Sequence, residues 1–110
     1  MEVQEFRVSV VIYPEGDVWI AQCLEYDIVS QGETIQDVQD RLTQNIAATL
    51  SVYADNGKNS LEDIPPAPKK FWEMFERATV RVSGRKRPMR SPRPLPPIRP
   101  VMRLIEDWAA

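Results

Sequence analysis

The sequence predicts an α+β domain in which one long helix covers a three- or four-stranded antiparallel sheet. Two observations support this prediction. Apolar and polar residues alternate near the N-terminus, as in half-buried strands, and after position 34 the apolar residues recur every three or four positions, as on one face of a helix. A chain of 110 residues has room for one such domain.

The first strands form a predicted hairpin. Residues 6–13 alternate and are rich in β-branched side chains, which predicts a strand. The turn-forming run Pro14-Glu-Gly-Asp17 follows, and residues 18–23 are the predicted second strand. A shorter third strand is predicted over residues 25–31.

The residues between the third strand and the helix predict a tight turn and a helix N-terminal cap. Gly32 is expected to adopt a positive φ at a tight exit from the third strand. Thr34 is suited to cap the helix N-terminus, with Asp37 as the acidic member of a capping box. The predicted order to this point is therefore β-β-β-α.

A long amphipathic helix is predicted over residues 35–55. Asn56 and Gly57 end it, since both residues readily adopt the left-handed C-terminal cap. One face carries the apolar residues that are expected to supply most of the core. These are Ile35, Val38, Leu42, Ile46, Leu50 and Tyr53.

A proline-rich loop over residues 60–68 leads to a short second helix over 69–77. Three aromatic residues in that helix, Phe71, Trp72 and Phe75, are expected to dock on the domain or on a second copy of it. Residues 79–82 fit either a further strand or the end of the helix. We place the end of the domain at residue 83.

The remaining residues, 84–110, form a predicted tail. Residues 84–100 contain six of the ten prolines and six basic residues, a composition that favours polyproline II over a packed fold. We therefore predict that the Arg/Pro-rich tail, residues 84–110, is disordered. Residues 101–108 are apolar enough for one or two helical turns on a partner surface.

Charge is distributed unevenly along the chain. The net charge is −2, yet residues 1–63 contain three bases against twelve acids, whereas residues 64–110 contain eleven bases against four acids. The acidic part would attract a basic protein and the basic part a nucleic acid. The alternatives are a solvated acidic surface with an inert tail, or attraction between the two parts. The single cysteine and the absence of a long apolar run favour the cytoplasm.

Enzyme chemistry finds little support in the composition. The chain has no histidine, which excludes any histidine-dependent dyad or triad and leaves Cys23 without a base to activate it. No glycine-rich phosphate loop is present, and no cofactor is expected. One metal alternative remains, a Mg²⁺-dependent nuclease. Its ligands would be Asp17, Glu25, Asp27 and Glu33.

An aromatic and acidic patch is the better candidate for binding. Trp19, Tyr26 and Ile28 lie close in sequence to Glu25 and Asp27, and aromatic residues rimmed by charge are typical of interface hot spots. The alternative, that Trp19 and Tyr26 are core residues beneath the helix, stays open.

The tail offers two further motifs. Its basic residues resemble nucleic-acid contact arms with weak sequence preference. They are Arg85, Lys86, Arg87, Arg90 and Arg93. Residues 94–99 also match the PxxPxR pattern of proline-rich peptide ligands.

Residues 6–13, the run from Trp19 to Thr34, the helix from Ile35 and the proline-rich exit at 64–68 together resemble the HicB-like antitoxin family. The run Ser30-Gln-Gly-Glu-Thr34 is the most specific part, and the resemblance covers roughly residues 5–78. It implies a degenerate RNase H-like fold, β-β-β-α-β, without catalytic carboxylates. It also implies self-association.

The resemblance further implies a partner, a small basic HicA-like RNase toxin whose active surface the antitoxin covers. Glu25, Tyr26, Asp27 and Ile28 would form much of the contact surface on an exposed strand. Asp17 and Glu33 would add electrostatic steering. Residues 79–110 contain no helix-turn-helix or ribbon-helix-helix segment, in contrast to the DNA-binding members of the family. The alternative is a stand-alone HicB-like regulatory or nucleic-acid-binding adaptor that acts through the basic tail.

Overall fold

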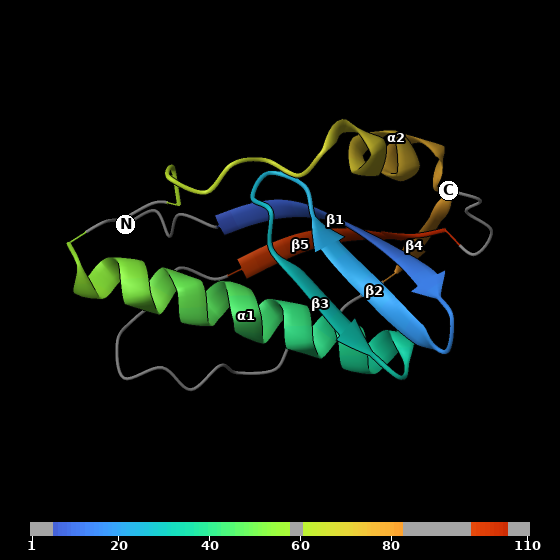
Figure 1. The fold of residues 1–110 in the computed structure, drawn as a ribbon, viewed down its shortest axis with the longest axis horizontal. Helices are drawn as coiled ribbons and strands as arrows, with labels where there is room; N and C mark the ends of the chain where they lie inside the picture. Colours follow the sequence, from blue (N-terminus) through green and yellow to red (C-terminus); the bar gives the residue numbers. More distant parts are fainter. Residues whose placement is uncertain (1–5, 58–60, 83–97, 106–110) are drawn as a thin grey trace.

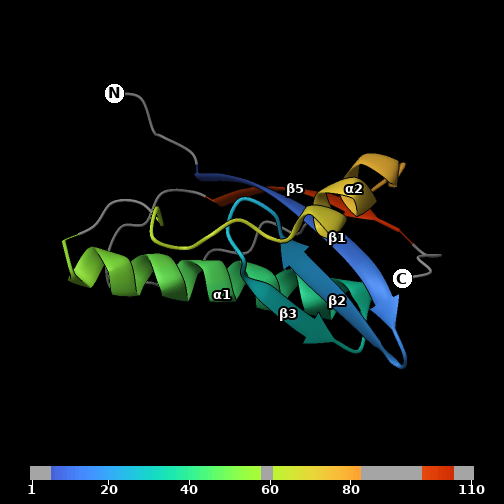
Figure 2. The ribbon, with the colours of Figure 1, turned by 45° about the horizontal axis from the view of Figure 1, so that its top comes forward.

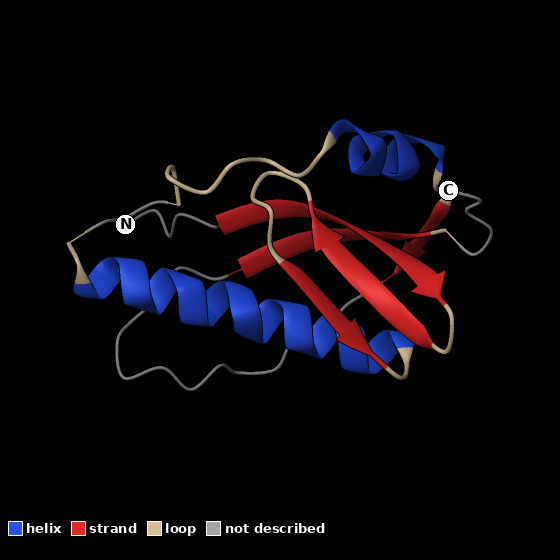
Figure 3. Cartoon of the chain, in the orientation of Figure 1, coloured by secondary structure: helices blue, strands red, loops and turns tan. Residues whose placement is uncertain are grey.

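The computed structural model describes residues 6–57, 61–82 and 98–105 (Figure 1). These residues form a five-stranded mixed sheet and two helices (Figure 3). In chain order the elements are β1 (Phe6–Glu15), β2 (Val18–Cys23), β3 (Val29–Gly32), α1 (Ile35–Asp55), α2 (Lys69–Arg77), β4 (Val80–Val82) and β5 (Ile98–Leu104).

The strand order in the sheet is β3-β2-β1-β5-β4. Neighbouring strands are antiparallel except β1 and β5, which are parallel. The predicted α+β class is confirmed, and the prediction of a purely antiparallel sheet is wrong. The physical reason is the direction in which the chain re-enters the sheet after β4. β5 pairs antiparallel with β4 and lies along the free side of β1, and there it runs in the same direction as β1.

The prediction of disorder across residues 84–110 is wrong for residues 98–104, which form β5. This strand lies between β1 and β4, so the sheet draws on both predicted units of the chain (Figure 1). Proline lacks a backbone N–H, but Pro100 can still occupy this strand. β4 pairs with β5 only from Met102 to Leu104, so the missing N–H of Pro100 interrupts no described pairing with β4. The helical turns predicted for residues 101–108 are likewise replaced by strand as far as Leu104.

The boundaries of α1, α2 and β2 agree with the predictions, and β4 confirms the strand alternative for residues 79–82. The third strand is shorter than expected, because residues 24–28 form a loop and β3 begins at Val29. Neither helix of the described residues is long and apolar enough to cross a membrane.

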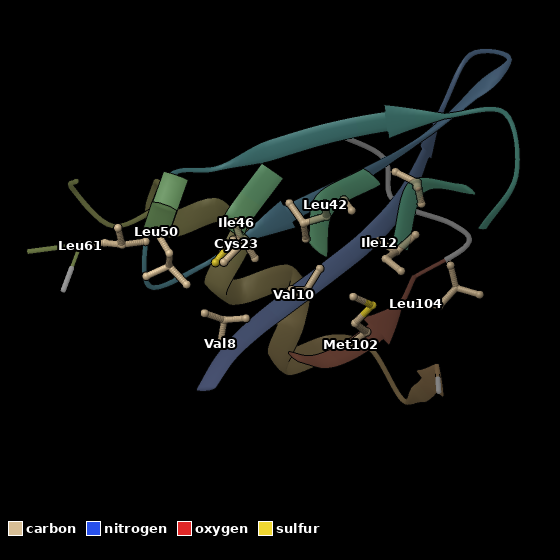
Figure 4. Close-up of a cluster of buried hydrophobic side chains, with 12 residues drawn as sticks. Val8, Val10, Ile12, Cys23, Leu42, Ile46, Leu50, Leu61, Met102 and Leu104 are labelled. Atoms are coloured by element: carbon tan, nitrogen blue, oxygen red, sulfur yellow. The ribbon is translucent and has the colours of Figure 1, made fainter. Parts of the chain in front are cut away.

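The larger core lies between α1 and one face of the sheet (Figure 4). Alternating residues of β1, including Val8, Val10 and Ile12, face Leu42 and Ile46 of the helix stripe, and all five are at most 1% exposed. Met102 and Leu104 of β5 complete this cluster. The apolar stripe of α1 therefore supplies one side of the core, as predicted.

A smaller core lies on the opposite face, beneath α2 (Figure 2). Here Val11 and Leu24 are fully buried against Met74 of α2. The aromatic residues Phe71, Trp72 and Phe75 pack on this cluster, which places them on their own domain. The sheet is thus covered by a helix on each face, and α2 docks on its own domain, which is one of the two alternatives predicted for it.

The predicted cap of α1 is present in part. The Asp37 backbone N donates to Thr34 Oγ1 at 2.9 Å, but the Asp37 carboxylate accepts from Glu33 N at 3.4 Å rather than from the N-cap residue. The positive φ expected at Gly32 is absent, because only Gly16 and Gly57 have one among the described residues. A different constraint acts on Gly32. A Cβ there would lie 2.9 Å from Val38 N, so glycine lets α1 approach the strand closely.

Candidate functional site at the β3 edge

β3 is one of the two outer strands of the sheet, and its side chains alternate between buried and exposed. Four residues form an exposed row along it and its flanks. They are Asp27, Val29, Gln31 and Glu33. Val29 is 51% exposed and is one of only four strongly exposed large apolar residues in the described part of the chain. We call this row the β3 edge surface.

The opposite side chains of β3 fix the strand to the helix. Ser30 Oγ donates to the Val38 carbonyl at 3.1 Å, and the Gly32 backbone lies against the first turn of α1. Because this side is locked, Val29 and Gln31 keep their outward orientation, and Asp27 and Glu33 flank them. The scaffold therefore presents the β3 edge surface rigidly.

A polar groove of about 530 Å³ runs between β3 and α1, beside the β3 edge surface. Asp37, Asp40 and Arg41 contribute its charged groups, and Arg41 Nε contacts Asp37 Oδ1 at 3.2 Å. This ion pair is largely exposed, so it contributes little to folding stability. With Glu33 at the nearby start of the helix, the acidic side chains outnumber the bases here, which favours a basic partner.

The loop at residues 24–28 carries four of the predicted contact residues, and it is held tightly. The Glu25 carboxylate accepts hydrogen bonds from Ser9 N at 2.7 Å and from Ser9 Oγ at 2.9 Å. Asp27 Oδ1 accepts from Gln22 Nε2 at 2.9 Å. The proline-rich segment before α2 also binds the loop, since Asp27 N donates to Pro65 O at 2.8 Å.

These contacts show what Glu25, Tyr26, Asp27 and Ile28 do within the fold. The pairing of β1 with β2 ends at Val10, and the Glu25 carboxylate continues the hydrogen bonding of β1 by accepting from the next residue, Ser9. Tyr26 stacks on Phe6 with ring centroids 5.6 Å apart, and Ile28 packs against the larger core. Of the four, only Asp27 is exposed, and the other three are half-buried.

The remaining predicted contact residues lie at the other end of β2. Asp17 is in the β1–β2 turn, and Trp19 pairs with Gly32 just before Glu33. Trp19 is partly buried against the larger core, as the alternative interpretation held. Four strand residues lie between Trp19 and the first loop residue, Leu24, a separation of about 17 Å at the usual rise per residue.

The four carboxylates that would bind Mg²⁺ in the nuclease alternative therefore lie at two different ends of β2. Glu25 and Asp27 lie in the loop, while Asp17 and Glu33 lie near the β1–β2 turn. Within the described ranges, no three His, Cys, Asp or Glu side chains are grouped so that they could hold a metal ion.

Cys23 lies in the larger core and is fully buried. Burial raises the pKa of its thiol from 9.0 to about 11, an effect that nearby backbone hydrogen bonds partly offset. The thiol is therefore protonated at neutral pH, a state that is weakly nucleophilic.

Sequence reasoning identified both acidic ends of the β3 edge surface, Asp27 and Glu33, but missed Val29 and Gln31. The predicted strand over residues 25–31 already contained both, but Val29 is apolar and Gln31 is neutral, so neither matched the aromatic and acidic pattern that selected the contact residues. The predicted nucleic-acid contacts lie outside the described residues. They are Arg85, Lys86, Arg87, Arg90 and Arg93.

Comparison with known proteins adds no assignment, because no family model, curated protein or solved structure matches this chain.

Proposed function

We propose that this chain is a non-catalytic protein-binding module that takes up a basic protein at the β3 edge surface. The observation that carries the proposal is the exposed, acidic row along an outer strand, held rigid by α1 and flanked by further acids in the groove. An outer strand has unpaired backbone groups to which a partner can add.

In its specific form the proposal is an antitoxin that occludes a small basic RNase of the HicA type. The HicB-like resemblance of residues 5–78 motivates this form. The order of the first elements supports the degenerate RNase H-like arrangement behind it, since an antiparallel β1-β2-β3 run and a helix are followed by β5, parallel to β1 and beside it. β4 and α2 are additions to that β-β-β-α-β scheme.

The other partner predictions remain proposals. Self-association into a homo-dimer is testable by light scattering of the purified chain. The adaptor alternative, in which the basic tail acts on nucleic acid, depends on residues outside the described ranges.

The first experiment is co-expression with the product of the adjacent open reading frame, scored by complex formation and by relief of growth arrest. The informative variant is Gln31→Lys with Glu33→Lys, because both side chains are exposed. We expect at least a tenfold higher Kd than wild type, about 1.4 kcal/mol, with loss of rescue.

The matched control is Glu73→Lys with Glu76→Lys, which makes a charge change at least as large on the exposed side of α2. Equal binding by the two double variants would overturn the surface assignment. A wild-type chain that neither forms a complex nor relieves arrest would overturn the antitoxin role. A variant at Tyr26 is less informative, because its ring stacks on Phe6 and its loss would weaken the fold.

A further inference from the structure

The pairing of β5 gathers arginine side chains on one face of the sheet. Arg7 of β1 is the register partner of Arg99 of β5, and Arg81 of β4 is the partner of Arg103 of β5. Residues that alternate with these, such as Val8 and Met102, point into the core beneath α1. The four arginines therefore project from the other face, the one that bears α2. We call these residues the arginine face.

The arginine face is open to solvent where α2 does not cover it. Arg7, Arg81 and Arg99 are exposed, and Val101, between Arg99 and Arg103 on β5, is 51% exposed. α2 instead packs over the part of the sheet that holds Val11.

The elements that carry three of the four arginines are basic, in contrast to the rest of the described chain. Residues 69–82 and 98–105 contain six bases against two acids, whereas residues 6–57 and 61–68, which include Arg7, contain two bases against ten acids. Two arginine pairs lie side by side here, so four guanidinium groups gather on one face of the sheet.

One arginine is held in place before any ligand arrives. Arg103 Nη1 donates to the Phe75 carbonyl at 3.2 Å, and its guanidinium lies 4.2 Å from the Phe75 ring centroid. This contact restricts the side chain and uses one of its five N–H donors. Binding an anion through the others costs less conformational entropy than ordering a free side chain.

We propose that the arginine face binds single-stranded nucleic acid through its phosphate backbone. The face spans about 13 Å along β5, from Arg99 to Arg103, and about 10 Å across three strands, so one small anion cannot engage all four side chains. Guanidinium groups match phosphate geometry, and all four bases on these strand positions are arginines. The half-exposed Val101 offers an apolar contact to a sugar or base. This site is separate from the β3 edge surface, because it lies towards the opposite edge of the sheet.

The test is fluorescence anisotropy of the full chain with a labelled thymidine oligonucleotide of about 20 nucleotides, at salt concentrations from about 25 to 200 mM. Four phosphate contacts predict a slope of log K against log salt of about −3. Arg81→Gln with Arg99→Gln is expected to reduce that slope by about 1.4 and to raise Kd at least fivefold at low salt. The matched control Arg41→Gln, on α1, is expected to bind like wild type.

Three results would overturn the proposal. One is no binding by wild type at the lowest salt. The second is an unchanged slope in the double variant, with loss of binding instead in Arg85→Gln/Arg87→Gln, which would assign binding to the predicted tail. The third is displacement of the oligonucleotide by polyglutamate of equal charge at equal concentration, which would identify a surface for acidic polypeptides. Circular dichroism spectra that match wild type would show that each variant is folded.

Discussion

Individual residues of the 24–28 loop serve the fold through specific contacts. Glu25 binds both the backbone and the hydroxyl of Ser9, and Asp27 binds the amide of Gln22, a residue only 3% exposed. Charge and aromatic content alone suggested a contact surface for these residues. The distances show that substitution of Glu25 or Tyr26 would test folding and binding together.

The buried Cys23 thiol predicts that folding stability depends on pH. Its pKa is about 11 in the folded chain against an ordinary 9.0, so between pH 9 and 11 the unfolded chain releases a proton that the folded chain retains. Stability from this group is complete below pH 9 and is lost as pH rises towards 11, by at most about 3 kcal/mol.

Urea unfolding of wild type and Cys23→Ala across that interval measures the effect. The wild-type free energy of unfolding is expected to fall more steeply. The variant is the control for other groups, including Tyr13 and Tyr26, whose pKa values burial also raises. Parallel pH profiles of the two proteins would contradict the prediction.

At the scale of elements, the contact between β3 and α1 depends on a missing side chain. Gly32→Ala would place a Cβ 2.9 Å from Val38 N and 3.1 Å from Val38 Cα, and backbone atoms cannot move aside cheaply. We expect a loss of about 1–3 kcal/mol in the free energy of unfolding, measured by urea titration.

Gln31→Ala is the matched control on the same strand. Its side chain is exposed, so we expect a change within about 0.5 kcal/mol of wild type. If Gly32→Ala were equally mild, α1 would have room to shift, and the rigid support inferred for the β3 edge surface would be lost.

For the whole molecule, the integrity of the sheet depends on β5. This strand pairs with β1 over seven residues and carries Met102 and Leu104 into the core. Burying one such side chain contributes roughly 1.5–3 kcal/mol, and small domains have only about 5–15 kcal/mol in total.

Truncation after residue 83 is therefore expected to abolish cooperative unfolding, as measured by circular dichroism during urea titration. Arg85→Gln/Arg87→Gln in the full chain keeps β5 and is expected to unfold like wild type. A truncated chain with the wild-type midpoint would show that β5 is dispensable. Deletion of residues 84–110 consequently cannot separate the role of the predicted tail from folding.

Local patterns in the sequence were sufficient for α1, α2 and β2, because helix periodicity, caps and strand alternation depend on residues a few positions apart. They also located the acidic ends of the β3 edge surface. Tertiary structure alone decided the place of β5. Proline content marked its segment as irregular, and pairing with β4 and with β1, which is about ninety residues away, stabilises it as a strand. These two pairings place Arg81 beside Arg103 and Arg7 beside Arg99, a proximity that no local pattern encodes.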